Sequence, residues 1–214
     1  MEVLELNPIE NKKIFVFLIK KEDNNLTYDE AHVLNDILEK YEFKFASIAI
    51  ESAKLNTFRN SDLALFLNEL LVPCFQVDIP EFAKGYLLNE IIEEEKELNE
   101  LEYEYNNLED KDSFKAQNLK SWIKYLKDQI QEKHNSLNTK IKANWIVKNL
   151  LGFIRYYEDT LFYENILYVI HFTPEKLIMI LKQILEELGI HVIIGEINEE
   201  ILIPTQKIDC QGAN

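Results

Sequence analysis

Residues 81–142 read EFAKGYLLNEIIEEEKELNELEYEYNNLEDKDSFKAQNLKSWIKYLKDQIQEKHNSLNTKIK, and they show the clearest periodicity in the chain. Apolar residues recur at spacings of three, four and seven in two separate runs, which is the pattern of one stripe along a helix. The runs are Leu87, Ile91, Leu98, Leu101, Tyr105 and Leu108, then Leu119, Ile123, Leu126, Ile130, Leu137 and Ile141. Between them Glu109–Ser113 has no apolar side chain, and Asp112 or Ser113 can cap the second helix. The pattern predicts an antiparallel, coiled-coil-like hairpin of two long helices.

Charge predicts how these two helices are aligned, because the first is rich in glutamate and the second in lysine. Placing Leu101 opposite Ile123 aligns the two apolar stripes. Flanking charges then set the orientation, as in coiled coils. This register predicts two ion pairs, Glu102 with Lys120 and Glu95 with Lys127. It also places Glu94 on the apolar stripe and Lys133 opposite Ile91, so we expect the middle of the hairpin to be looser than its tip.

Five short apolar runs outside the hairpin predict buried strands. They are Lys13–Ile19, Lys44–Ile50, Cys74–Ile79, Ile166–Phe172 and His191–Ile197. Their continuous apolar character suits parallel strands that are covered on both faces, and they alternate with helical patterns. Thr27 and Glu30 form a capping-box motif before one of these helices, and Gly189 follows the last. The sequence therefore predicts an α/β fold with a mostly parallel sheet of five or six strands and helices on both faces.

The order of these patterns predicts the domain organisation. We expect one discontinuous α/β body from residues 1–80 and 144–205, interrupted by the hairpin as an insertion at 81–143. A short sixth strand at Glu200–Ile203 can extend the sheet, and residues 206–214 are expected to form a flexible tail.

Composition excludes several classes of protein. The 214 residues are 47% hydrophobic, which excludes a largely disordered chain. The net charge is -15, and Arg59 and Arg155 are the only arginines, so nucleic acid is not an expected partner. No apolar run is long enough to span a membrane, and the acidic N-terminus does not resemble a secretory leader. Two thiols without a CxxC motif, Cys74 and Cys210, favour a cytoplasmic location.

Motifs that would assign a reaction are missing from the sequence: there is no GxGxxG, GxxxxGK[ST], GxSxG or HExxH. Acidic residues do lie at the carboxyl ends of several predicted strands, where ligands of open α/β sheets bind. The candidate catalytic residues there are Glu51, Asp78, Glu196 and His171, with Glu51 and Asp78 as candidate ligands for Mg²⁺. The alternatives are a solvated edge without chemistry and a small-ligand pocket.

Aromatic residues provide the other candidate site. Tyr103, Phe114, Trp122 and Tyr125 lie along the hairpin outside its stripes, and the helix from Trp145 to Tyr163 carries Trp145 and Tyr156. These side chains are candidate anchors for a partner; alternatively Trp122 shields the hairpin seam and the aromatic helix covers the sheet. We expect an intracellular, non-enzymatic interaction or adaptor protein without a cofactor, which binds a protein partner or a second copy of itself. The alternative is a Mg²⁺-dependent nuclease or phosphotransferase.

Overall fold

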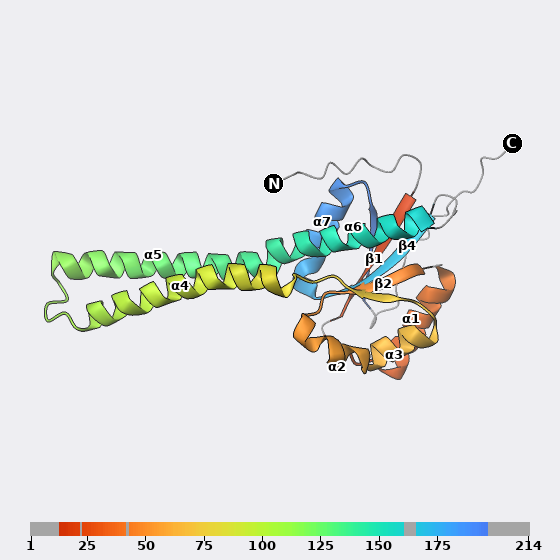
Figure 1. Ribbon diagram of the computed structural model, residues 1–214, viewed down its shortest axis with the longest axis horizontal. Helices are drawn as coiled ribbons and strands as arrows, with labels where there is room; N and C mark the ends of the chain where they lie inside the picture. Colours follow the sequence, from red (N-terminus) through yellow and green to blue (C-terminus); the bar gives the residue numbers. More distant parts are fainter. Residues whose placement is uncertain (1–12, 22, 42, 161–165, 197–214) are drawn as a thin grey trace. The chain divides into compact units, whose positions relative to one another are not determined.

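The computed structural model describes residues 13–21, 23–41, 43–160 and 166–196 (Figure 1). The chain divides into two compact units. The first, Met1–Val77 with Val147–Asn214, is called the sheet unit below, and the second, Asp78–Ile146, is called the helical unit.

The sheet unit contains a five-stranded parallel sheet. Its strands are β1 (Lys13–Lys20), β2 (Phe43–Ile48), β3 (Cys74–Gln76), β4 (Ile166–Thr173) and β5 (His191–Glu196), in the order β3-β2-β4-β1-β5. All four strand pairings are parallel, which confirms the predicted α/β class. β3 ends at Gln76 rather than at the predicted Ile79. The predicted strand Glu200–Ile203 and the tail at 206–214 lie outside the described residues.

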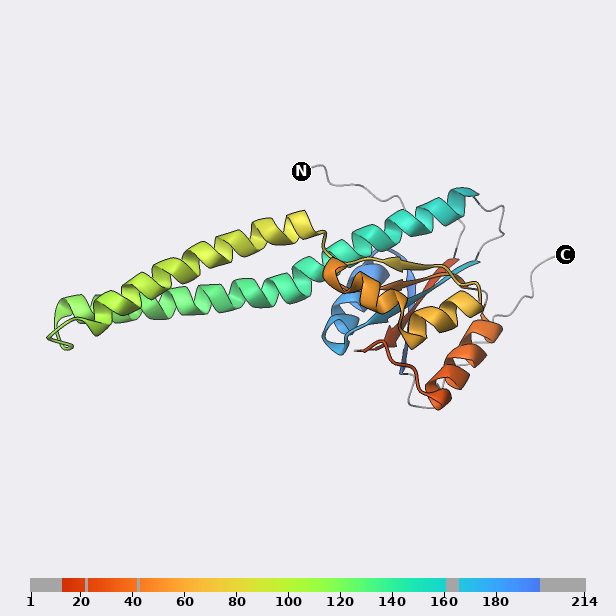
Figure 2. The same cartoon turned by 60° about the horizontal axis from the view of Figure 1, so that its bottom comes forward.

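Helices cover both faces of this sheet (Figure 2). On one face, α1 (Tyr28–Lys40), α2 (Leu55–Arg59) and α3 (Asp62–Glu69) enclose the main apolar core together with β1, β2 and β4. On the other face Phe45 contacts the rings of Phe153 and Tyr157 from α6 (Lys142–Thr160). Phe153 also stacks on Phe75, with ring centroids 4.2 Å apart. Phe153 and Tyr157 therefore cover the sheet, which agrees with the alternative that the aromatic helix packs against it.

Helix ends in the sheet unit follow the predicted signals. The amide of Glu30 donates to Thr27 Oγ1 at 3.3 Å and the amide of Thr27 donates to Glu30 Oε2 at 2.8 Å, so the capping box is formed. α7 (Glu175–Glu187) begins after Pro174, and Gly189, which has φ +77°, follows its last turn. The amide of Ile190 donates to the Leu185 carbonyl at 3.0 Å, so the helix ends in a Schellman motif.

α3 ends with the same hydrogen-bond pattern, but a leucine occupies the left-handed position. The amide of Val72 donates to the Leu67 carbonyl at 2.9 Å, and Leu71 has φ +57°. A non-glycine residue is strained there by about 1–2 kcal/mol. Gly189→Ala should thus lower the free energy of unfolding by about 1 kcal/mol, and Leu71→Gly should raise it by up to about 1 kcal/mol. Urea denaturation of both variants checks this, and equal signs for the two changes would contradict it.

The helical unit contains a pair of antiparallel helices, α4 (Glu81–Asn106) and α5 (Phe114–Ser136). Ion pairs join Glu104 to Lys115 at 2.6 Å and Glu94 to Lys133 at 2.8 Å, and this reversal of order establishes the antiparallel direction. A π-helical segment, Leu137–Ile141, leads from α5 into α6. One buried apolar cluster of the unit contains Ile79, Ile91, Ile130 and Leu137.

The flanking ion pairs differ from those that the sequence predicted. Glu102 contacts Lys127 at 2.6 Å rather than Lys120, and Glu95 contacts His134 at 3.4 Å rather than Lys127. Both glutamates therefore pair with a residue seven positions further along α5. Flanking positions recur every seven residues and both alternatives are basic, so charge identifies the correct side of the helix but not the correct turn.

Two residues that interrupt the apolar stripes bond to each other. Lys133 donates to Glu94 at 2.8 Å and lies 4.0 Å from Glu90. The hydrogen bond to Glu94, together with the charges of both glutamates, raises the pKa of Lys133 in spite of some desolvation. The two charges that appeared to disrupt the seam thus neutralise each other. The predicted packing of Leu101 opposite Ile123 stays a prediction.

Candidate functional site

The carboxyl end of a parallel sheet is where ligands bind in open α/β folds. Lys20 ends β1 there and Lys21 follows it, and their charges are paired within the sheet unit. Lys20 contacts Glu175 at the start of α7 at 3.0 Å, and Lys21 contacts Glu30 and Asp23, each at 3.1 Å. These pairs bind the strand end to the helices beside it, and so the two lysines are already neutralised by neighbouring carboxylates.

Glu30 shows how this network responds to pH. Burial opposes ionisation of its carboxyl group, but hydrogen bonds from Thr27 and Lys21 outweigh this effect and lower the pKa of Glu30. A lowered carboxyl pKa stabilises the fold above the unfolded pKa, and this stabilisation is lost as the pH falls through the folded pKa. Glu30→Gln should therefore reduce the melting temperature at pH 7 and flatten its fall on acidification, and a parallel shift at every pH would contradict this assignment. Circular dichroism melts between pH 7 and pH 3 measure both.

A buried polar pair lies behind this edge, on the face that α6 and α7 cover. Ser47 Oγ and His171 Nδ1 are 2.8 Å apart, and both residues are fully buried. Thr173 is also fully buried, and within the described part of the chain its hydroxyl has no hydrogen-bond partner. Serine beside histidine is the arrangement of an activated nucleophile. A substrate has no access to Ser47 in this conformation, however, so the pair acts here as an internal polar contact.

The structure places the predicted catalytic residues in different settings. Glu51 is partly exposed and lies 3.9 Å from Lys54, whereas Glu196 ends β5 with its backbone in register with Lys20. Asp78 belongs to the helical unit, where it is buried. Among the described residues, no group of three or more His, Cys, Asp or Glu side chains is arranged to hold a metal ion.

Asp78 has other bonds that explain its burial. Its Oδ2 atom is 2.9 Å from Lys142 Nζ, and its Oδ1 atom accepts from the amide of Ile79 at 2.7 Å. A carboxylate that is held by an ammonium group and a backbone amide is a poor ligand for Mg²⁺. Adding 5 mM Mg²⁺ should thus leave the melting temperature unchanged. A rise that Asp78→Asn abolishes would contradict this expectation and restore the Mg²⁺ alternative.

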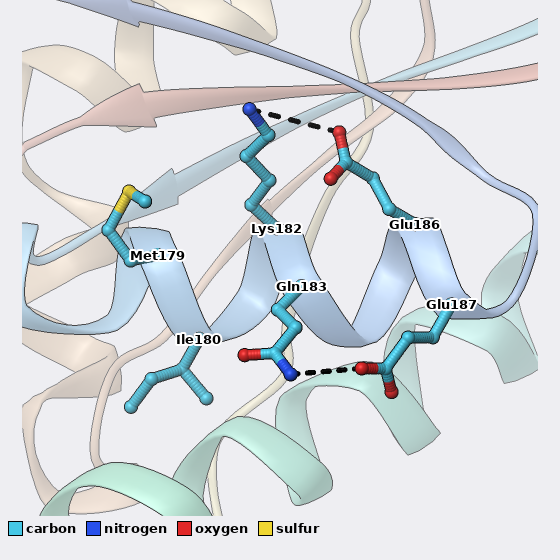
Figure 3. A pocket seen from close by; sticks show the side chains of 6 residues that line it. All are labelled: Met179, Ile180, Lys182, Gln183, Glu186 and Glu187. Atoms are coloured by element: carbon cyan, nitrogen blue, oxygen red, sulfur yellow. Dashed lines mark hydrogen bonds and ion pairs between the residues drawn. The ribbon is translucent and has the colours of Figure 1, made fainter.

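A surface depression of about 550 Å³ lies along α7 (Figure 3). It is lined by Met179, Ile180, Lys182, Gln183, Glu186 and Glu187. The polar side chains bond to each other along the helix, Lys182 to Glu186 at 3.8 Å and Gln183 to Glu187 at 2.9 Å. No convergent set of polar groups points to a small ligand at this surface.

The aromatic side chains of the helical unit form a more promising surface. Phe114, Tyr103, Tyr125 and Trp122 are 79%, 73%, 51% and 48% exposed. The rings of Trp122 and Tyr125 stack with centroids 5.4 Å apart. Beside them is a depression of about 640 Å³, lined by Phe114, Lys115, Asn118, Leu119, Ser121 and Trp122. Large apolar side chains that are not needed inside the fold are typical of binding surfaces.

The two remaining candidate anchors differ. Tyr156 on α6 is exposed, whereas Trp145 packs partly buried against the apolar cluster of the helical unit. Burial raises the pKa of the Cys74 thiol to about 12, so this thiol is protonated at neutral pH. Within the described ranges, no helix combines the length and apolar character needed to cross a bilayer.

Comparison with protein-family models, with curated proteins and with solved structures found no match to this chain.

Proposed function

We propose that this protein binds another protein through α4 and α5, as a non-enzymatic interaction or adaptor protein. In this proposal the two helices are a coiled-coil-like hairpin at 81–143, inserted into an α/β body of residues 1–80 and 144–205. The cytoplasmic location expected from the cysteines belongs to the same proposal.

One observation supports it most. The apolar stripes of α4 and α5 are already satisfied within the helical unit, where Ile91 and Ile130 are buried. The exposed rings of Phe114, Trp122 and Tyr125 are therefore surplus to the packing of the two helices. Large side chains of this kind carry most of the binding energy at protein interfaces. No comparable observation favours the Mg²⁺-dependent nuclease or phosphotransferase.

The test compares two triple variants that each replace three large, exposed hydrophobic side chains with serine. The first is Phe114→Ser, Trp122→Ser and Tyr125→Ser in the helical unit. The control is Tyr28→Ser, Leu71→Ser and Met179→Ser, which removes exposed apolar side chains from the sheet unit. Partners captured from the native cell are identified by cross-linking, and the complex is rebuilt from purified proteins. We expect binding to be lost in the first variant and kept in the control, and the reverse result contradicts the proposal.

A further inference from the structure

Two rows of residues line the same side of the helix pair. On α4, Glu93, Glu97, Glu100 and Glu104 are spaced by four, three and four residues and form an acidic ridge. On α5, Phe114, Asn118, Trp122 and Tyr125 are spaced by four, four and three residues and form an aromatic stripe. Each row is one face of its helix, and every member of both rows is exposed.

Two contacts show that the rows face the same side. Trp122 Nε1 donates to Glu97 Oε1 at 3.3 Å, and Lys115, next to Phe114, contacts Glu104 at 2.6 Å. The pairs of Glu95 with His134 and Glu102 with Lys127 lie on the opposite side of the seam. Glu95 and Glu97 are two residues apart, or about 200° around the helix, which is consistent with this division.

We infer that this side of the helix pair binds a basic amphipathic helix of a partner protein. The aromatic stripe extends over about 16 Å of α5, or three helical turns, which matches a helix that presents apolar side chains every three or four residues. The acidic ridge beside it matches lysine or arginine on one flank of that helix. This inference rests on the proposed function, and it names the class of partner.

Charge argues against nucleic acid or a second copy of the chain as the partner at this surface. The acidic ridge repels nucleic-acid phosphates. A second copy would bring its own excess of negative charge, since the chain has a net charge of -15. A basic helix relieves the repulsion among the glutamates, and its apolar side chains cover the rings of Trp122 and Tyr125.

The probe is a synthetic helical peptide of roughly 18 residues, or five turns, with leucine on one face and lysine on the other. Two further peptides replace lysine with glutamate or scramble the order of leucine and lysine. Trp145→Phe leaves Trp122 as the only tryptophan, so its fluorescence reports binding at the stripe. We expect a saturable one-to-one complex with a blue shift for the first peptide only.

Matched charge reversals test the location of binding. Glu93→Lys with Glu100→Lys changes the acidic ridge and spares the internal contacts of Glu97 and Glu104. Glu69→Lys with Glu109→Lys changes the charge equally at exposed positions outside the ridge and breaks no ion pair described above. The ridge variant should raise the dissociation constant of the peptide about ten-fold or more, and the control should raise it less than about three-fold. Equal losses in both, or no binding to the wild type, would overturn the inference.

Two further outcomes separate this inference from the function on which it rests. If the serine variant of the aromatic stripe loses its captured partner but the peptide binds both charge variants equally, the interaction function stands and the basic-helix inference is wrong. If sedimentation shows self-association that Trp122→Ser abolishes, the occupant is a second copy and the inference is again wrong.

Discussion

Lys142→Met should lower the free energy of unfolding by about 2–4 kcal/mol, because it removes the ammonium group that pairs with the buried carboxylate of Asp78. The two side chains are 20% and 6% exposed and their charged atoms are 2.9 Å apart. Breaking a fully buried ion pair costs about 3–5 kcal/mol of stability. Because water still reaches Lys142, we expect a slightly smaller cost for this pair.

The matched control is Lys182→Met, which breaks the exposed contact to Glu186 on α7. It should change stability by less than about 0.5–1 kcal/mol. The double variant Asp78→Asn with Lys142→Met should recover part of the loss, because asparagine still accepts from the amide of Ile79. Urea denaturation followed by circular dichroism compares the four proteins. If Lys142→Met costs no more than Lys182→Met, the buried pair does not stabilise the fold.

The parallel sheet could be predicted because each strand is recognisable from its local sequence alone. A continuous apolar run such as Ile14–Ile19 indicates a buried strand even when the adjacent strands are not known. The order β3-β2-β4-β1-β5 was not predicted, because periodicity reports which faces are buried and not which strand lies beside which. β4 lies between β1 and β2, although it follows β3 in the chain by 90 residues (76 to 166).

Contacts between side chains were harder to predict for the same reason. Ser47 meets His171 only because β2 and β4 are in register across 124 residues of sequence. Asp78 lies near the carboxyl end of a predicted strand and was interpreted as a metal ligand, but its carboxylate pairs with Lys142. The π-helical segment Leu137–Ile141 changes the rotation of every residue after it, so α-helical counting from α5 does not predict the direction of Lys142.

The exposed aromatic surface could be predicted better, because it depends only on local spacing. Once the apolar stripe of α5 is assigned, Phe114, Trp122 and Tyr125 fall outside it, and the structure shows all three exposed. The side of the pair that they share with the acidic ridge required the contact between Trp122 and Glu97. Their role in binding stays a prediction.

Replacing residues 88–136 by a short glycine and serine linker should leave the sheet unit folded and abolish partner binding. The main core of the sheet unit draws all its buried residues from that unit, among them Phe17, Leu34, Leu67 and Phe172. The replacement also keeps Asp78 and Lys142, whose charged atoms lie 2.9 Å apart and hold the two ends of the helical unit together. A flexible linker of six residues spans about 12–15 Å, which is enough to join the two ends of the helical unit when this ion pair holds them together.

Two measurements on this deletion separate folding from binding. Near-ultraviolet circular dichroism should retain the signal of packed aromatic rings, to which Phe45, Phe75 and Phe153 contribute, and partner capture should fall to background. If the shortened chain fails to fold, the segment is part of the core architecture rather than an inserted hairpin. If it folds and keeps its partner, the binding surface lies in the sheet unit, where Tyr156 is the exposed ring to change first. Loss of binding with an intact sheet is the result that follows from a helix pair whose apolar stripes are satisfied internally.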